Sequence, residues 1–527
     1  MTIRFAIIPL LLVHALAAQQ PRYDILIAGG RVIDGTGARR YRADVAITGD
    51  RVAAISRRPL SRAIASRVID AAGRVVTPGF IDLHAHLEPL PELPGTRSAV
   101  TQGVTTALGG PDGTSPWPFA AYLDAREHQH TGINVAFLVG HNTVRRTVMG
   151  DANRAPTVDE LARMRAMVAQ AMGEGAFGLS TGLKYIPGAY SNVDEVVTLS
   201  QAASDSGGIY TSHLREEGLG LLQGVAEAIV IGRRAHIPIV LTHHKAVGQQ
   251  MWGKSSVTLH MLDSARRAGI DVMADVYPYT ATHTGISILI PGWALADGDT
   301  AFARRIGDRV LKDSIVQGIV FNILNDRGGG DLHRVQFSRV AWDTSLEGKT
   351  LADWATRRAL PLTPATGAAL VIEAQLKGGA NAIYHVLDEG DVRRIMRHPQ
   401  TMIASDGRLS TPGDGHPHPR AYGTFPRVLG HYVRAGVLSL EQGVHKMTGM
   451  PAARLGLADR GRLRVGAMAD VVVFDPRTIT DRSTFAAPHQ YATGIDYVLV
   501  NGVVAVDGGS FTDSRAGRVL RHRPLSK

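Results

Sequence analysis

The sequence predicts an α/β protein built on a parallel sheet or a (β/α)8 barrel, with a small β module assembled from both ends of the chain. Short apolar runs alternate with helix-like stretches through the middle of the chain. Both ends instead contain short β-type runs separated by turn residues. Several of the middle runs end in titratable residues, and the carboxyl ends of barrel strands are where active sites are built.

Length and composition limit the classes of protein to which this chain can belong. The chain has 527 residues, 44% of them hydrophobic, so it can bury the core of a large barrel and of a smaller module. The formal net charge of +10 is spread along the chain and aromatic residues make up only 6%, which argues against a nucleic-acid groove. Cysteine is absent, so any metal site must use His, Asp, Glu or a modified Lys.

The first residues resemble an export signal. Arg4 precedes an apolar run over 5–13, and small residues follow at Ala15 and Ala17. This pattern predicts a signal peptide over 1–17 that is cleaved after Ala17, with a buried first strand or an uncleaved anchor as the alternatives. We therefore expect a periplasmic or secreted protein whose mature chain has no integral membrane segment.

The two ends of the chain are expected to form one module. Residues 22–78 contain short alternating runs and turns, and residues 460–510 do the same. In the second range, Asn501-Gly502 stands between two apolar runs, which is a hairpin signal. The barrel is then expected over residues 79–459.

The middle of the chain supplies the barrel units and an insertion. The stretch from about 281 to 398 is too long for a connecting loop and contains helical patterns, so we expect a lid-like insertion that covers the site and shapes an acyl pocket. Three tryptophans in or near it could line an apolar channel, although ordinary packing is the favoured interpretation: Trp293, Trp342 and Trp354. The barrel strands are expected at apolar runs such as 135–139, 209–212, 239–242 and 272–276.

The most informative local motif is a pair of histidines. His84 and His86 follow the apolar pair Phe80-Ile81 and lie two residues apart. Because side chains of a strand alternate between its faces, both imidazoles are expected to point to the same side. Two such imidazoles at a strand end form half of a site for a divalent metal ion.

Further metal-competent residues follow later apolar runs. His213, His243 and Asp406 each come directly after such a run. Any one of these histidines could be an ordinary core residue. In a barrel, however, all of these side chains would converge on one rim together with the histidine pair. The sequence therefore predicts a single metal site.

These residues carry a resemblance to known enzymes. Their order, from His-x-His through two single histidines to Ser405-Asp406-Gly407, resembles the amidohydrolase superfamily. Longer stretches resemble its D-aminoacylase (N-acyl-D-amino-acid deacylase) family: 178–183, 187–190, 212–218, 275–280 and 418–430. The resemblance covers residues 22 to 505 and is weakest in the insertion.

The resemblance implies a fold and an activity. The fold would be a (β/α)8 TIM-type barrel with a small β-sandwich module from both termini and a lid-like insertion. The activity would be hydrolysis of the amide bond of N-acyl amino acids, and of N-acyl-D-amino acids in particular, to a carboxylate and a free amino acid. One or two Zn²⁺ ions would serve as cofactor for this small-molecule substrate, and the pattern leaves the oligomeric state open.

The resemblance also implies residue roles. Asp406 would be the catalytic acid and base, accepting a proton from an activated water and passing it to the leaving amine. Four histidines would bind metal: His84, His86, His213 and His243. The substrate carboxylate would be held by Lys245, Tyr277 and Arg420, with Tyr279 and His283 nearby.

One position departs from the family pattern. The family usually has a bridging cysteine in an Asn-Cys-Gly turn after the second strand, whereas this chain reads Pro111-Asp112-Gly113. A carboxylate can bridge metal ions but is a harder ligand than a thiolate. We expect Asp112 to be the bridge, with a carboxylated Lys184 as the alternative. Glu88 is expected to have a supporting role rather than to bind metal.

Two other functions stay open on sequence grounds. One is a related amide hydrolase that acts on dipeptides or cyclic amides with the same chemistry. The other is a catalytically silent exported binding protein that keeps the barrel. The presence of both Asp406 and the histidine pair argues against the second.

Overall fold

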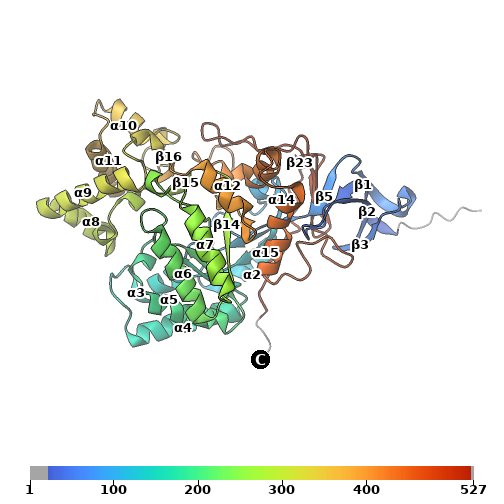
Figure 1. The fold of residues 1–527 in the computed structure, drawn as a ribbon, viewed down its shortest axis with the longest axis horizontal. Helices are drawn as coiled ribbons and strands as arrows, with labels where there is room; N and C mark the ends of the chain where they lie inside the picture. Colours follow the sequence, from blue (N-terminus) through green and yellow to red (C-terminus); the bar gives the residue numbers. More distant parts are fainter. Residues whose placement is uncertain (1–21, 524–527) are drawn as a thin grey trace, which may run out of the picture.

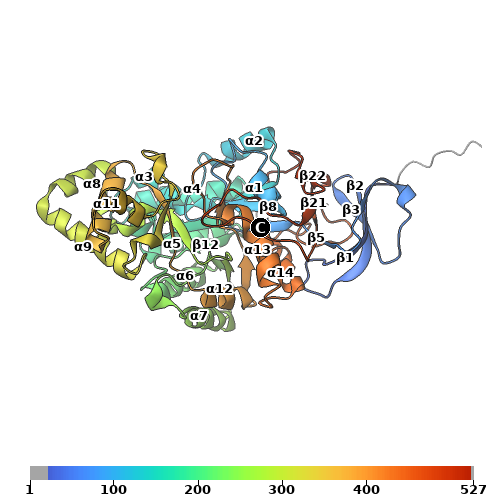
Figure 2. The same cartoon turned by 90° about the horizontal axis from the view of Figure 1, so that it is seen from above.

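The protein is elongated, and its three structural parts follow one another along the long axis (Figures 1 and 2). The computed structural model describes residues 22–523, so the predicted signal peptide over 1–17 lies outside the described residues. The β module lies at one end, the barrel in the middle and the helices of the insertion at the other end (Figures 1 and 2). Among the described residues, we find no helix with the length and apolar character needed to cross a membrane.

The middle of the chain forms a closed barrel of parallel strands. β6, β8 and β9 pair in that order, and β10, β11, β12, β13, β14 and β18 pair in a second run. β19 pairs with β7 in parallel and thereby closes the ring. Taking β6/β7, β9/β10 and β18/β19 each as one interrupted strand gives the eight-stranded barrel that the sequence predicted. The bounds are β6 (Phe80–Asp82), β7 (Ala85–His86), β8 (Val104–Gly109), β9 (Asn134–Phe137), β10 (Val139–Gly140), β11 (Gly178–Gly182), β12 (Ile209–His213), β13 (Ile239–Leu241), β14 (Val272–Val276), β18 (Thr401–Ile403) and β19 (Gly407–Arg408).

Helices cover the outside of this barrel. α4 illustrates why they form: Thr157 and Glu160 make a reciprocal capping box at its start, and Met164, Val168 and Ala171 put a buried stripe on one face. The barrel helices are α2 (Phe119–Gln129), α3 (His141–Met149), α4 (Val158–Gly173), α5 (Val193–Ser204), α6 (Leu221–Ala235), α7 (Ser255–Arg267), α12 (Glu389–Arg397), α13 (Arg420–Arg427), α14 (Leu440–Lys446) and α15 (Gly449–Arg454).

Both ends of the chain build one nine-stranded sheet, the β-sandwich module of the predicted fold. The joint is the antiparallel pair of β5, from the N-terminal part, and β20, from the C-terminal part. The predicted hairpin at Asn501-Gly502 connects β21 to β22, and Asn501 has a positive φ of 49° there. The strands are β1 (Tyr23–Val32), β2 (Tyr41–Thr48), β3 (Arg51–Ser56), β4 (Ala65–Asp70), β5 (Val75–Pro78), β20 (Val471–Phe474), β21 (Ile495–Val500), β22 (Val503–Asp507) and β23 (Ser510–Phe511).

The insertion has its own small core. β15 (Thr282–Gly285), β16 (Val335–Arg339) and β17 (Asn381–Tyr384) form an antiparallel sheet. Buried Ile315, Ile319 and Ile323 repeat along α9 and pack into this core. Trp342 and Trp354 also pack there, with ring centroids 5.4 Å apart, rather than lining a channel. The helices are α8 (Gly298–Gly307), α9 (Arg309–Asn325), α10 (Leu351–Arg357) and α11 (Pro364–Leu376).

The insertion ends earlier than the range 281–398 suggests. α12 falls within that range but packs against α7 and β18 of the barrel. A helical pattern alone does not tell a barrel helix from an inserted one.

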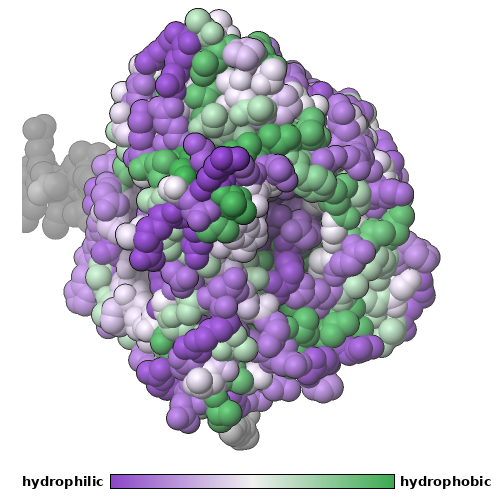
Figure 3. All heavy atoms as spheres, turned by 90° about the vertical axis from the view of Figure 1, so that its left-hand side faces the viewer, coloured by the Kyte–Doolittle hydropathy of each residue, from purple (hydrophilic) through white to green (hydrophobic). Residues whose placement is uncertain are grey.

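Seen from the insertion end, the surface mixes hydrophilic and hydrophobic residues and is hollowed near its centre (Figure 3).

Candidate metal centre

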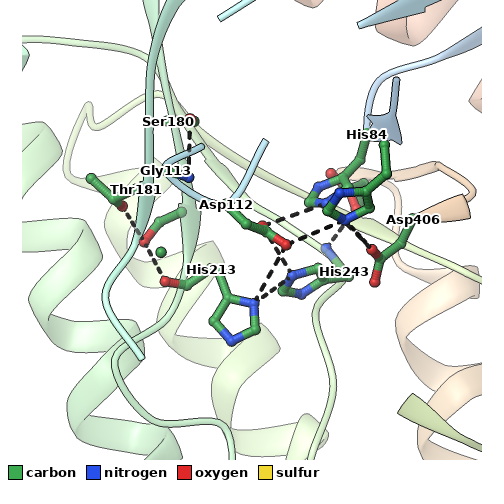
Figure 4. Close-up of polar contacts among 12 residues, drawn as sticks. His84, Asp112, Gly113, Ser180, Thr181, His213, His243 and Asp406 are labelled. Carbon is green, nitrogen blue, oxygen red and sulfur yellow. Dashed lines mark hydrogen bonds and ion pairs between the residues drawn. The ribbon is translucent and has the colours of Figure 1, made fainter. Parts of the chain in front are cut away.

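Six side chains meet at the rim where the barrel strands end; Figure 4 labels all of them except His86. They come from five places far apart in the chain and point toward one another because the strands are parallel and closed into a ring. They are His84 and His86 from the first barrel strand, Asp112 after β8, His213 at the end of β12, His243 after β13, and Asp406 between β18 and β19.

The six residues form two groups that share Asp112. One group is His84, His86, Asp112 and Asp406, the other Asp112, His213 and His243, and the ligand atoms within each group lie within 4.8 Å of one another. In the first group, the Oδ1 atom of Asp406 lies 3.2 Å from His86 Nε2 and 3.5 Å from His84 Nε2. In the second, His213 Nδ1 lies 2.8 Å from His243 Nε2, which lies 3.3 Å from Asp112 Oδ1.

Three of these residues have an unusual backbone. Asp112, His243 and Asp406 have positive φ angles of 53°, 37° and 49°, a region that costs energy for residues other than glycine. Gly113 follows Asp112 with a φ of 78°, and a Cβ atom there would lie 2.1 Å from Asn142 Oδ1. Such strain gathers at functional sites, where the surrounding fold holds it in place.

The residues present fit zinc. Both ring nitrogens of His84 and Oδ1 of Asp112 are buried and lack a hydrogen-bond partner. Buried polar atoms are normally paired, so these orphaned atoms suit coordination of a metal ion. Imidazole nitrogens and carboxylate oxygens are zinc donors, and a chain without cysteine has no thiolate to offer. Two adjacent groups sharing one carboxylate suit one or two ions.

The charges of the site favour a cation. Burial opposes ionisation of Asp112, but the neighbouring imidazoles of His84 and His243 outweigh it and hold the pKa of Asp112 well below its usual range. Burial also opposes protonation of His243, yet Asp112, Glu217 and Asp406 together raise its pKa to about 9. The carboxylates therefore attract positive charge, and a metal ion is one that this donor set can hold.

Glu217 supports both histidines of the second group, a role that sequence reasoning missed. Its Oε1 atom lies 3.2 Å from His243 Nδ1 and its Oε2 atom lies 3.6 Å from His213 Nε2. Lys245 donates to the same Oε1 atom over 2.6 Å. Glu217 stands four residues after His213 within a stretch that resembles the family, so position within that motif was the available signal.

The contacts of Lys245 depend on the protonation of His243. Lys245 Nζ also lies 2.6 Å from His243 Nδ1. An imidazole that binds an ion through Nε2 carries its proton on Nδ1 and donates it to an acceptor. Glu217 Oε1 is the acceptor in reach, so Lys245 then loses its contact with His243, keeps its ion pair with Glu217, and has an N–H donor left for a substrate.

A cavity of about 440 Å³ opens next to the six residues. Four of the residues that the sequence predicted to bind or lie near the substrate line it: Lys245, Tyr277, His283 and Arg420. Arg420 Nη1 lies 2.7 Å from Asp406 Oδ2, and the guanidinium stands 4.8 Å from the centre of the Tyr277 ring. The buried Tyr277 hydroxyl has no hydrogen-bond partner, so it is free to contact a ligand.

Two residues that the sequence placed in or near the site, Tyr279 and Lys184, lie outside the cavity and the ligand groups. Tyr279 does not line this cavity; its hydroxyl donates to the Pro419 carbonyl over 3.4 Å and its ring packs against His418. Lys184 makes an ion pair with Glu216 at 2.7 Å and lines a neighbouring groove, so it does not join the ligand groups. Glu88 lies 3.1 Å from His86 Nδ1, which matches the supporting role expected of it.

Further cationic residues line the cavity without a sequence signal. Arg327 reaches it from the insertion, with only 2% of the residue exposed, and Arg146, Arg339 and Arg408 also line the cavity. Arg408 belongs to β19, directly after Asp406, whereas Arg146, Arg327 and Arg339 do not follow a predicted barrel strand, and only the folded chain brings these three here. A cavity so rich in positive charge attracts anionic ligands.

Comparison with known proteins finds relatives that cover most of the chain. A family model described as "Amidohydrolase family" matches residues 67–307 and 348–506. The chain is 41% identical to an N-acyl-D-glutamate deacylase of Alcaligenes xylosoxydans xylosoxydans, over 95% of this chain and 97% of the relative. It is 39% identical to a D-aminoacylase of the same organism, over 94% and 97%, and 36% identical to its N-acyl-D-aspartate deacylase.

Solved structures agree with these relatives. The N-acyl-D-glutamate deacylase of Bordetella bronchiseptica, complexed with zinc and a phosphonate inhibitor, superposes with a TM-score of 0.81 at 37% identity over 95% of this chain and 100% of that one. A D-aminoacylase described as having a binuclear metal centre gives 0.80 at 37% identity, with the same coverage of both chains. The dihydropyrimidinase of Brevibacillus agri gives 0.58 at 16% identity and shares the fold alone.

Proposed function

We propose that this chain, which belongs to the amidohydrolase family, hydrolyses the amide bond of N-acyl-D-amino acids to a carboxylate and a free D-amino acid. The observation that carries the proposal is the pairing of two metal-ligand groups that share Asp112 with a cationic pocket at the same rim. The ligand groups suit amide hydrolysis, and the cations suit the free carboxylate of an N-acyl amino acid. The three deacylase relatives support the D configuration.

The ligand groups define where zinc would bind. His84, His86, Asp112 and Asp406 would hold one ion, and Asp112, His213 and His243 would hold the other. A bound divalent ion supplies Lewis acidity, which lowers the pKa of water to about 7 and polarises a carbonyl oxygen.

Asp406 moves the proton. Burial opposes its ionisation, but Arg420 and the neighbouring imidazoles hold its pKa well below the usual range, so it is a carboxylate at neutral pH. As water adds to the amide carbon, Asp406 accepts the water proton. It then delivers this proton to the amide nitrogen, which leaves as an amine when the C–N bond breaks.

The cationic wall positions the substrate. Arg420 can donate two parallel hydrogen bonds to a carboxylate, whereas Lys245 contributes a compact charge. The unpartnered Tyr277 hydroxyl can donate a third hydrogen bond. These contacts fix the carboxylate next to Asp406 and place the amide beside the ligand groups.

A substrate panel tests the proposal. Zinc-loaded protein is assayed with N-acetyl derivatives of several D- and L-amino acids, with dipeptides and with hydantoins, and Asp406→Asn is the inactive control. We expect hydrolysis of the D derivatives. A preference for dipeptides, hydantoins or L derivatives would overturn the assignment, and loss of all hydrolysis would favour a binding protein.

We also propose that the protein is exported. Support comes from Arg4, the apolar run over 5–13 and the small residues at Ala15 and Ala17. Expression of the full chain in a Gram-negative host, followed by intact-mass measurement of the periplasmic fraction, tests this. Mature protein that begins at Ala18 is expected, and uncleaved protein confined to the cytoplasm would contradict it.

A further inference from the structure

A second groove, lined by residues of the barrel and its loops, adjoins the catalytic cavity. It has a volume of about 560 Å³, and mostly apolar side chains line it. We call it the acyl groove and define it by its main apolar residues: Leu87, Pro116, Trp117, Ala121, Tyr122 and Phe137. Glu88 and Thr114 line both this groove and the catalytic cavity, so the two are continuous.

The groove is built from fixed parts of the barrel. Leu87 follows the first barrel strand, Trp117 and Tyr122 follow the second, and Phe137 lies on the third. Leu87 and Phe137 are each only 2% exposed, and the Tyr122 ring packs edge-on against Phe137 with centroids 5.3 Å apart. A buried apolar floor with half-exposed aromatic walls suits a hydrocarbon rather than a charged group.

Substrate geometry directs the acyl group to this side. Lys245, Tyr277 and Arg420, which are proposed to hold the carboxylate, follow the sixth, seventh and eighth barrel strands. The groove follows the first three strands, across the mouth of the eight-stranded ring. A trans amide sends its acyl chain and its α-carbon in opposite directions. A substrate whose carboxylate lies at the sixth to eighth strands therefore points its acyl chain at the part of the groove that follows the second and third strands.

The other groove beside the cavity is less suited to a hydrocarbon chain. It shares Tyr185 and Thr284 with the cavity but also contains the Lys184–Glu216 ion pair and Arg215. Burying these charges under a hydrocarbon chain would cost free energy. The acyl groove presents one acidic side chain, Glu88, at its junction with the cavity, where Glu88 is already paired with His86.

We infer that the acyl groove binds the hydrocarbon end of the substrate, so that the protein prefers N-acyl amino acids with unbranched acyl chains of medium length over N-acetyl derivatives. This inference rests on the proposed deacylase function and names the substrate class of that site. It also moves the acyl pocket from the insertion, where the sequence placed it, to residues of the barrel.

A chain-length series tests the inference. kcat/KM is measured for N-acetyl, N-hexanoyl and N-decanoyl derivatives of one D-amino acid. We expect a rise of about fourfold per added methylene until the groove is filled, which corresponds to about 0.8 kcal/mol each. A kcat/KM that stays constant or falls from the N-acetyl to the N-hexanoyl derivative would overturn the inference.

A matched pair of variants locates the effect. Ala121 and Ala125 are both exposed on α2, one turn apart, but only Ala121 lines the groove. Ala121→Trp is expected to lower the decanoyl-to-acetyl ratio of kcat/KM at least tenfold, and Ala125→Trp to leave it unchanged. Equal decanoyl-to-acetyl ratios of kcat/KM in both variants would refute binding of the acyl chain in this groove. So would a change of oligomeric state in Ala121→Trp without a change in the ratio, which would make the groove an interface between copies.

Binding of decanoate separates this inference from the proposed function. If no N-acyl amino acid is hydrolysed, the deacylase proposal fails. Calorimetry with decanoate then tests separately whether the groove binds a hydrocarbon chain. Binding that Ala121→Trp weakens and Ala125→Trp does not would support a hydrocarbon site. Binding that is absent or insensitive to both substitutions would overturn it.

Discussion

Replacing Glu217 by glutamine tests whether one buried carboxylate orients both histidines of the second ligand group. Glu217 Oε1 lies 3.2 Å from His243 Nδ1, and its Oε2 lies 3.6 Å from His213 Nε2. A glutamine keeps the shape but loses the negative charge and one acceptor. Losing such a partner typically weakens metal binding 10- to 100-fold, equivalent to about 1.4–2.7 kcal/mol.

The substitution also affects stability, because Lys245 loses its carboxylate partner. Removing one member of a buried ion pair costs about 3–5 kcal/mol. The double variant Glu217→Gln/Lys245→Met removes both charges and should recover most of this stability. Its zinc affinity should stay weak, because the partner of the two imidazoles is still missing, so the two effects separate.

The assay is competition with a zinc chelator, paired with thermal unfolding of the metal-free protein. Glu216→Gln is the matched control, because Glu216 pairs with Lys184 outside the ligand groups. Its zinc affinity should stay within about twofold of the parent. Zinc affinity of Glu217→Gln within the same range would refute the orienting role of this carboxylate.

Three other changes test separate parts of the account. Asp406→Asn should lower kcat by about 10²–10⁴ and also weaken zinc binding at the group with His84 and His86, which rate measurements and metal analysis check. Asp112→Ala should lower zinc content at both groups, because both contain it; metal analysis showing two ions retained would contradict sharing. Burial lowers the pKa of Lys446 to about 8. The folded state therefore binds fewer protons than the unfolded state between about pH 8 and 10.4, and stability rises with pH there by up to about 3 kcal/mol relative to Lys446→Met, as denaturant titrations at several pH values would show.

The sequence predicted the fold class and the gathering of the ligand residues well. Parallel barrel strands bring their carboxyl ends to one rim, so each polar residue after an apolar run could be placed without knowing any side-chain contact. His84 and His86 illustrate this, since their spacing alone put both rings on one side. His213, 127 residues further along the chain than His86 by its numbering, reaches the same Asp112 because of the closed ring.

Residues whose position depends on long-range packing were harder to predict. Tyr279 follows Tyr277 by two residues, yet it packs under Arg427 and against His418, because the chain turns away from the strand at this point. Arg327 enters the cavity from the insertion, where no periodic pattern fixes the direction of a side chain. Glu217 gains its role only from the folded positions of two histidines.

Anomalous diffraction at the zinc absorption edge from crystals of zinc-loaded protein tests the central claim most directly. The account predicts at least one strong peak within about 2.0–2.2 Å of both a carboxylate oxygen of Asp112 and a ring nitrogen of His84, His86, His213 or His243. A second peak on the other side of Asp112 would show that the carboxylate bridges. Zinc bound away from Asp112, or bound only at surface residues, would contradict the account.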